Sequence, residues 1–223
     1  MDGRRPGTHN SAVQHQRVAS TAALLADPSR AAMVLALMDG RSRSAKKLAL
    51  DAGITPQTAS AHLRKLVAAN MLAWQGQGRS KYFRLAGADI AQAVEALSEI
   101  GVKQIPAAAR ELRLARCCYD HLAGRLGVAV TEQLLRPANT VLRDLGMDLD
   151  RLERSRRALL RCCTDWTERR PHVAGALGAA LLRRYLDDGW LLAAKESRKL
   201  EVTLRGREMF VRLIGVERAL FPG

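Results

Sequence analysis

Apolar residues recur at helical spacing through the first part of the chain. From residue 11 to residue 38 they follow the period of an amphipathic helix, interrupted at Asp27-Pro28-Ser29. We expect Asp27 to cap a second helix that has Pro28 at its first position, where a missing N–H has no partner to lose. A short third helix is predicted around Leu48. It should end at Gly53, because glycine adopts the left-handed conformation that closes many helices.

A fourth helix is predicted to begin at Thr55, its N-cap, with Pro56 in the first turn. Steps of about 100° per residue divide this helix into two faces. The apolar face holds Ala59, Leu63, Leu66 and Val67. The polar, cationic face holds Gln57, Thr58, Ala61, Arg64 and Lys65, with Ser60 and His62 at the boundary. One side of the helix therefore packs, and the other is presented to solvent or to a ligand.

Two short strands and a further helix follow. Residues 72–75 and 81–85 read as strands joined by the glycine-containing residues 76–80, and residues 88–100 read as an amphipathic helix. Helix, turn, helix and hairpin in this order are typical of a winged helix-turn-helix. We expect residues 11–101 to form that domain, after a disordered lead-in at residues 1–10, with Pro106 in a short linker.

The second half contains an internal repeat. Residues 116–121, Arg-Cys-Cys-Tyr-Asp-His, recur as Arg-Cys-Cys-Thr-Asp at 161–165 and, after an insert at 166–171, His172. We expect the second copy to continue as a helix through Leu186, strands at 190–193 and 200–204, and a last helix. The segment 136–148 is too short to form such a hairpin in the first copy, and it contains a proline that would interrupt a strand. The chain is therefore predicted to be mainly α with short β-hairpins. A helical, degenerate winged-helix-like domain at 107–223 follows the first domain.

Charge singles out the same N-terminal region. The 223 residues include 36 Lys and Arg against 22 Asp and Glu, a net charge of +14. Nine of the basic residues lie between Arg41 and Arg84, with Asp51 as the one acid among them. A basic segment attracts polyanions through contacts with phosphate. Double-stranded DNA is therefore the first partner to consider.

The sequence indicates neither export nor a membrane span. No apolar run approaches the ~20 residues that cross a bilayer, and residues 1–16 lack the apolar core of a secretory signal. The four cysteines occur as the adjacent pairs Cys117-Cys118 and Cys162-Cys163. Because adjacent cysteines bridge each other only with strain, we expect reduced thiols in a cytoplasmic protein.

The candidate DNA contacts lie on the fourth helix and the hairpin. A helix enters the major groove when its outer face is slim and offers donors and acceptors to the base edges. Short polar side chains near the start of the helix suit bases, and later Arg and Lys side chains suit phosphates. The predicted set is Gln57, Thr58, Ser60, His62, Arg64, Lys65, Arg79 and Lys81. The boundary position of His62 favours packing over base reading.

Three segments resemble the arsenic-repressor type (ArsR/SmtB) of bacterial winged-helix regulators. They lie within residues 18–100 and read LADPSR at 25–30, TPQTASAHL at 55–63 and GRSKYFRL at 78–85. The resemblance implies a homodimer formed through the first and fifth helices. It also implies operator binding that represses transcription until an effector releases the protein. It places Gln57, Thr58, Ser60, His62 and Arg64 in the groove-facing helix, and Arg79 and Lys81 in the wing.

The familiar metal sites of that family do not carry over to this sequence. Residues 45–50, in the short third helix, contain no Cys-x-Cys pair. The predicted fifth helix offers Asp89, Glu95 and Glu99 but no histidine. The C-terminal half looks like the extended members of the family, in which similar Cys-Tyr-Asp-His segments recur.

The repeated Cys, Asp and His residues form a second candidate site. If the two copies pack about a pseudo-twofold axis, six residues meet: Cys118, Asp120, His121, Cys163, Asp165 and His172. This set suits a soft or borderline divalent metal or arsenic(III) as effector, and the thiols suit oxidant sensing. The competing interpretation is structural. The cysteines then pack as small hydrophobes, the aspartates cap helices and the histidines bond to backbone carbonyls.

Two other functions stay open beside a repressor released by an effector. One is an architectural or non-specific nucleic-acid-binding protein without an effector. The other is a thiol-dependent enzyme that uses Cys118 or Cys163 with a histidine. The sequence contains no Cys-x-x-Cys, phosphate loop, dinucleotide fingerprint or serine elbow, so we expect neither an enzyme nor a resident cofactor. Residues 166–172, which include a tryptophan, suit an organic-effector pocket or a cap on the core.

Overall fold

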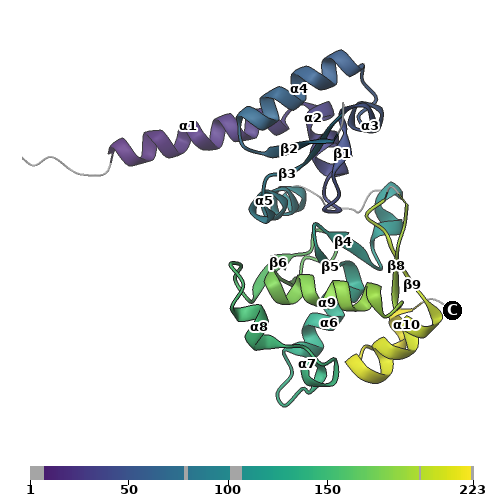
Figure 1. Cartoon of the computed structure of the whole chain (residues 1–223). Coiled ribbons are helices and arrows are strands. Elements are labelled where there is room, and N and C mark those ends of the chain that lie inside the picture. Colours follow the sequence, from purple (N-terminus) through teal and green to yellow (C-terminus); the bar gives the residue numbers. More distant parts are fainter. Residues whose placement is uncertain (1–7, 78–79, 101–106, 196, 222–223) are drawn as a thin grey trace, which may run out of the picture. The chain divides into compact units, whose positions relative to one another are not determined.

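The computed structural model describes residues 8–77, 80–100, 107–195 and 197–221 (Figure 1). They divide into two compact units. The first consists of residues up to 37 together with 41–87, and the second of residues 38–40 together with 88–223. None of the described helices is long and apolar enough to cross a membrane. Arg79, one of the predicted DNA contacts, lies outside the described residues.

The first unit combines four helices with a small antiparallel sheet. Its helices are α1 (Thr8–Leu25), α2 (Pro28–Ala36), α3 (Ala45–Asp51) and α4 (Pro56–Ala68). Its strands β1 (Arg43–Ser44), β2 (Leu72–Gln77) and β3 (Ser80–Leu85) pair in the order β1-β3-β2. The predicted helix-turn-helix and hairpin are confirmed, and β1 is an addition that the sequence pattern did not indicate.

Side-chain caps determine where these helices begin. The Arg30 N–H donates to Asp27 Oδ1 at 2.9 Å, and the Thr58 N–H donates to Thr55 Oγ1 at 3.2 Å, so both predicted caps are present. Ser44 caps α3 in the same way, and Gly53, after that helix, has a φ of 63°. One such cap contributes about 1 kcal/mol to the stability of a helix.

The apolar face of α4 packs into the core of the first unit. Ala59, Leu63 and Leu66 are buried as predicted, and Val67 is half-buried. The same core contains Met33, Val34, Leu37, Leu48, Ala49, Met71, Leu72, Phe83 and Leu85. Because this face is held against α2, α3 and the sheet, the opposite face of α4 is fixed in its outward direction.

The second unit begins with α5 (Ala88–Glu99) and contains two copies of a hairpin followed by a helix. The first copy is β4 (Arg116–Cys118), β5 (His121–Ala123) and α6 (Gly124–Leu134). The second is β6 (Arg161–Thr164), β7 (Pro171–Ala174) and α9 (Gly175–Asp187). The other elements are η1 (Ala107–Leu112), α7 (Val141–Asp144), α8 (Leu149–Glu153), β8 (Leu191–Ala193), β9 (Leu200–Val202), α10 (Leu204–Met209), η2 (Phe210–Ile214) and η3 (Arg218–Leu220).

The two copies pack reciprocally. Strand β5 contacts α9, β7 contacts α6, and β5 and β7 contact each other. Helices α6 and α9 both begin at a left-handed glycine, with φ of 83° at Gly124 and 81° at Gly175. A Cβ at either position would lie 2.7 Å from a backbone oxygen, so no larger residue fits. The repeat seen in the sequence is therefore a structural repeat as well.

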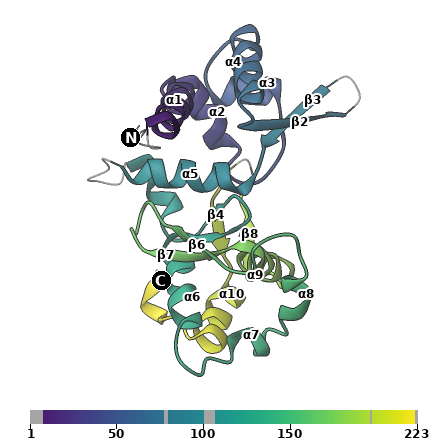
Figure 2. The same ribbon diagram turned by 90° about the vertical axis from the view of Figure 1, so that its left-hand side faces the viewer.

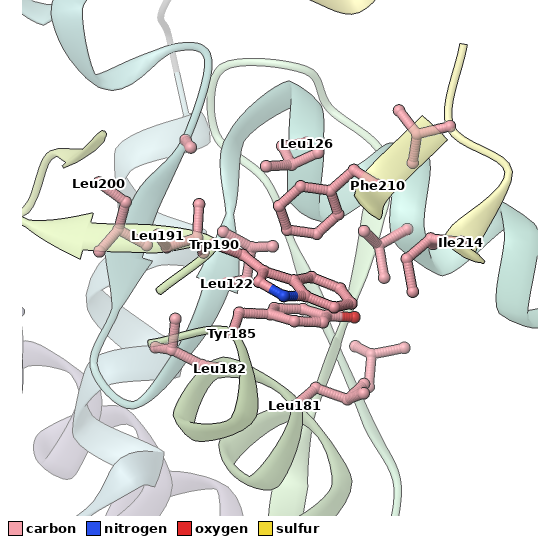
Figure 3. Close-up of a cluster of buried hydrophobic side chains, with 14 of the residues drawn as sticks. Leu122, Leu126, Leu181, Leu182, Tyr185, Trp190, Leu191, Leu200, Phe210 and Ile214 are labelled. Carbon is pink, nitrogen blue, oxygen red and sulfur yellow. The ribbon is translucent and has the colours of Figure 1, made fainter. Parts of the chain in front are cut away.

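An aromatic cluster lies in the core of the second unit (Figure 3). The rings of Tyr185 and Trp190 stack with centroids 5.3 Å apart, and Phe210 meets both rings edge-on at 4.9 and 5.5 Å. Leucines from α6 and α9, among them Leu126 and Leu181, surround the rings. This core joins the β8–β9 hairpin and α10 to the two repeated copies.

The repeated Cys-x-Asp segments differ from the helix-capping interpretation. Asp120 lies in the turn between β4 and β5, and Asp165 follows β6, so neither precedes a helix of its own copy. The expectation that they cap the next helix is therefore wrong. The reason is that residues 121–123 and 171–174 form strands, which pair with the cysteine-containing strands and delay the start of each helix.

Three other details differ from the sequence pattern. Helix α1 begins at Thr8, inside the lead-in expected at residues 1–10, and residues 1–7 lie outside the described part. Residues 136–148 contain the short helix α7. Helix α5 groups with the second unit, because Glu95 forms ion pairs with Arg116 and Arg198 there. A functional boundary at residues 101–107 stays a prediction.

Candidate DNA interface and buried cysteine–histidine cluster

Helix α4 presents a polar face to solvent. Gln57, Arg64 and Lys65 are exposed on it, and so are Thr58 and Ser60. The Thr58 hydroxyl lies 3.0 Å from the N-cap hydroxyl, and Ser60 Oγ donates to a carbonyl one turn earlier at 2.8 Å. These local bonds compete with base contacts for both hydroxyls. Gln57 is therefore the side chain of this face best suited to read a base edge.

His62 is held by the start of α2 instead. Its Nδ1 lies 3.3 Å from Arg30 Nη1, and its Nε2 lies 3.8 Å from Asp27 Oδ1. The side chain is 14% exposed. This geometry favours the packing interpretation, and a role of His62 in DNA contact stays a prediction.

The β2–β3 hairpin carries a cation over an aromatic ring. Lys81 Nζ lies 4.3 Å from the centroid of the Trp74 ring, which is half exposed. Such a contact contributes about 0.5–1 kcal/mol at an exposed site. Figure 2 shows β2 and β3 extending beyond α3 as a two-stranded ribbon. The contact with Trp74 therefore fixes the Lys81 charge on the ribbon.

A groove of about 780 Å³ runs between α4 and the sheet of the first unit. Its walls include Lys46, Arg64, Trp74 and Lys81. Three cations around one concave surface focus a positive potential, which suits a phosphate backbone. Lys46 and Trp74 are not in the predicted contact set. The signals for them in the sequence were the basic first turn of α3 and a large aromatic residue between Ala73 and Gln75 of β2.

The architecture agrees with comparisons to known proteins. A helix-turn-helix domain family matches residues 25–73. The uncharacterized HTH-type transcriptional regulator YdfF of Bacillus subtilis (strain 168) is 38% identical over 221 residues, which cover 90% of this chain and 98% of YdfF. The chain belongs to this family of helix-turn-helix transcriptional regulators. The DNA-binding class of protein recognised in the sequence is thus confirmed.

Solved structures of winged helix-turn-helix proteins are similar to part of the regulator. The homodimeric DNA-binding domain Mb0332 from Mycobacterium bovis, described as a possible ArsR-family regulator, is 27% identical. The comparison covers 44% of this chain and 86% of that one, with a TM-score of 0.37. The transcriptional repressor BigR from Xylella fastidiosa is 27% identical over 43% of this chain and 96% of its own, with a TM-score of 0.38.

The second unit brings four of the six repeated residues to one point. Cys118 pairs across its hairpin with His121, and Cys163 pairs with His172 in the same register. The two Sγ atoms lie 3.9 Å apart, and the two Nε2 atoms lie 3.2 Å apart. All four side chains are buried, and their ligand atoms lie within 4.8 Å of one another.

The two aspartates lie behind the histidines rather than among the inner four. Asp120 Oδ1 is 3.3 Å from His121 Nδ1, and Asp165 Oδ2 is 3.7 Å from His172 Nδ1. The histidines therefore face each other and a carboxylate, which replaces the backbone-carbonyl partners of the structural interpretation. Asp165 Oδ2 also accepts a hydrogen bond from Gly124 N at 2.6 Å. It caps the helix of the other copy.

A fully buried arginine connects Asp165 to α5. Arg116 Nη2 lies 3.0 Å from Asp165 Oδ2 and 3.7 Å from Glu95 Oε2. Glu95 also pairs with Arg198. The half-buried ring of Trp166 lies 5.2 Å from the Arg116 guanidinium. This position favours the core-capping interpretation of Trp166 over the effector-pocket one.

The two histidines have pKa values shifted in opposite directions. Burial favours the neutral ring of His121, but hydrogen bonds with Asp120 and Cys118 outweigh it and raise its pKa to about 9. Burial, followed by the charge of His121, lowers the pKa of His172 to about 3. A single proton, carried by His121, is therefore shared in the hydrogen bond between the two Nε2 atoms.

The Cys118 thiol of the cluster is not activated for nucleophilic chemistry. The hydrogen bond to Cys163, together with burial, raises the pKa of Cys118. A nucleophilic cysteine needs the opposite shift. The other member of each pair is turned away, since Cys117 Sγ donates to Tyr119 O at 3.3 Å and Cys162 is exposed. This environment favours packing or ligation over a thiol-dependent reaction.

Proposed function

We propose that the regulator binds operator DNA as a homodimer and represses transcription until an effector releases it. The observation that carries the proposal is the exposed polar face of α4, fixed outward by Leu63 and Leu66 and flanked by the cation-lined groove. A major groove admits a helix whose outer side chains are short or flexible, and Gln57 offers both a donor and an acceptor to a base. We expect Arg64, Lys65 and Lys81 to contact the phosphates on either side.

The dimer part of the proposal is supported by apolar exposure on the two helices that the ArsR/SmtB resemblance assigns to the interface. Val18 on α1 is 64% exposed and Leu97 on α5 is 50% exposed. Large apolar side chains at such positions are stabilised when a second copy removes them from water. Sedimentation of the purified protein tests this part directly, and a monomer at micromolar concentration contradicts it.

An architectural binder is the competing function, and base reading separates the two. A regulator with an operator binds one site more tightly than random duplex by ~10³–10⁷. An architectural protein depends on phosphates and shows little such difference. The presence of an amide, Gln57, near the N-terminal end of the exposed face of α4 favours the operator-binding function.

The test is a gel-shift titration over a salt series, with DNA from the upstream region of the regulator's own coding sequence and a scrambled duplex. The double change Arg64→Ala and Lys65→Ala should weaken both complexes and reduce the log–log salt slope by about 0.9 per lost phosphate contact. The matched control is Arg183→Ala with Arg205→Ala, exposed arginines of the second unit. The control should leave both values unchanged.

Two results would overturn the proposal. One is no mobility shift with any fragment of the organism's genome at low ionic strength. The other is an equal loss of binding in the control pair, because it would mean that net charge rather than α4 drives the association. Repression itself is tested by in vitro transcription from the bound promoter, where added protein should reduce the transcript.

A further inference from the structure

We propose that Cys118, His121, Cys163 and His172 bind one divalent cation of the zinc type in a closed tetrahedral site within the second unit. This inference is independent of the DNA-binding function proposed above. All four residues belong to one compact unit and come from two paired hairpins, β4–β5 and β6–β7. Each hairpin contributes one thiol and one imidazole.

The sulfur–sulfur and nitrogen–nitrogen separations match two edges of a tetrahedron around zinc. Bonds of ~2.3 Å to sulfur and ~2.05 Å to nitrogen set tetrahedral edges of ~3.8 Å between two sulfurs and ~3.3 Å between two nitrogens. The corresponding separations here are 3.9 Å between the Cys118 and Cys163 sulfurs and 3.2 Å between the Nε2 atoms of His121 and His172. Both of these edges therefore already have the lengths that a bound zinc ion requires.

A carboxylate lies behind each imidazole. Asp120 Oδ1 is within hydrogen-bonding distance of His121 Nδ1 at 3.3 Å, and Asp165 Oδ2 lies at ion-pair distance, 3.7 Å, from His172 Nδ1, so both carboxylates face the ring nitrogen opposite Nε2. A carboxylate behind a ligating histidine is the usual outer partner in zinc sites. The aspartates are themselves held, Asp120 by Arg157 at 2.6 Å and Asp165 by Arg116 at 3.0 Å. They support the site and are not ligands.

Charge and burial favour a permanently closed site. Two thiolates neutralise a dication, so the loaded cluster places no net charge in the interior. Cys118 and His172 are 0% exposed, which leaves no open coordination position for a substrate. Two sulfurs with two nitrogens in a tetrahedral arrangement are the ligand set of zinc rather than of magnesium or calcium. The inferred role is to tie the two copies together, and the cation adds to the stability of the second unit.

The neighbouring cysteines provide matched controls. Cys162 is adjacent to Cys163 in sequence but exposed, and Cys117 is directed to Tyr119 O at 3.3 Å. The Cys162→Ser variant should therefore keep the cation, and Cys163→Ser should lose it. Asp120→Asn should weaken zinc affinity by ~10–100-fold, the usual effect of losing an outer partner.

The experiment uses the full chain, purified under reducing conditions and stripped with a chelator. Zinc titration with elemental analysis should give one tightly held ion per chain, and added zinc should raise the melting temperature. Cobalt(II), used as the spectroscopic probe, should give the visible bands of a tetrahedral site with two thiolate-to-cobalt charge-transfer contributions. The Cys162→Ser control should give the same spectrum.

The wild-type protein alone makes the proposal falsifiable, even if Cys163→Ser fails to fold. A stripped, reduced wild-type chain that neither takes up zinc nor shifts its melting temperature contradicts the site. Octahedral cobalt bands, or a spectrum that persists in a folded Cys118→Ser variant, contradict the assigned ligands. A disulfide between Cys118 and Cys163 that forms even in the presence of zinc also contradicts the site. It would be detected as only two reactive thiols when the protein is denatured without a reductant.

Discussion

Arg116 and Asp165 are both completely buried and lie 3.0 Å apart, from Arg116 Nη2 to Asp165 Oδ2. The arginine comes from the first repeated copy and the aspartate from the second. The same guanidinium faces Glu95 of α5 at 3.7 Å. Burial opposes ionisation of Asp165, but Arg116 and hydrogen bonds from Thr167 and Gly124 outweigh it and lower the pKa of this carboxyl. One guanidinium thus connects α5, the first copy and the second through two ion pairs.

Replacement of this arginine should destabilise the second unit strongly. Arg116→Met leaves the buried Asp165 carboxylate without its arginine and Glu95 with Arg198 alone, and breaking a buried pair costs about 3–5 kcal/mol. The matched control is Arg113→Ala, which removes an arginine that is 50% exposed and pairs with Glu168 at 2.9 Å. Exposed pairs contribute about 0–1 kcal/mol. Thermal unfolding followed by circular dichroism should therefore show a large fall for the first change and little for the second.

Close packing behind His121 makes Gly178 intolerant of a side chain. A Cβ at Gly178 would lie 2.5 Å from Val173 O and 3.1 Å from His121 Cβ. Gly178→Ala should destabilise the protein by about 1–3 kcal/mol, the usual penalty of overpacking. Gly76→Ala is the control, since no atom of the described residues outside its chain neighbours lies within 4 Å of its added Cβ. Equal urea midpoints for the two variants would show that the hairpin can move aside.

The Lys81–Trp74 contact gives a prediction that separates charge from positioning. Lys81→Ala should reduce the salt slope of DNA binding by about 0.9, because one phosphate contact is lost. Trp74→Leu keeps the charge and removes the ring beneath it. It should weaken binding but leave the slope unchanged. Gel-shift titrations at several salt concentrations measure both quantities, and a slope that falls in Trp74→Leu would contradict the positioning role.

His62 and Gln57 should respond differently to truncation. His62→Ala removes the contacts with Arg30 and Asp27 and should lower stability by about 1 kcal/mol, while the ratio of operator to random binding stays constant. Gln57→Ala should narrow that ratio with little change in stability, because its side chain is exposed. Differential scanning fluorimetry and competition gel shifts test the pair. A smaller ratio of operator to random binding in His62→Ala would show that this histidine does contact a base.

Local signals made the first unit predictable. Asp27-Pro28 and Thr55-Pro56 each place a cap before a proline, and both helices begin there. The apolar face of α4 follows from its period alone, because a helix brings residues three or four apart together. Strand β1 was missed, since two residues carry no period and Arg43-Ser44 pairs with Phe83 and Tyr82 some forty positions later.

The buried cluster was only partly predictable, because it depends on contacts far apart in the chain. The repeated letters indicated which residues meet, and the structure places Cys118 beside Cys163 as the repeat suggested. The separate roles of the cysteines and aspartates depend on hairpin register, which sequence alone does not determine here. Neither Arg116 nor Glu95 was expected in the network, since charged residues are rarely buried unless paired.

The capping of α6 by Asp165 of the other copy has a consequence for the integrity of the molecule. Each copy packs its helix against the hairpin of the other, so neither copy should fold without its partner. The chain segment between α6 and β6 connects the two copies, as a linker would connect two domain-swapped protomers. A proteolytic nick in this segment, between α7 and α8, would sever the chain without separating it. The two fragments would remain non-covalently associated until the protein is denatured, and a change that destabilises one copy would destabilise both.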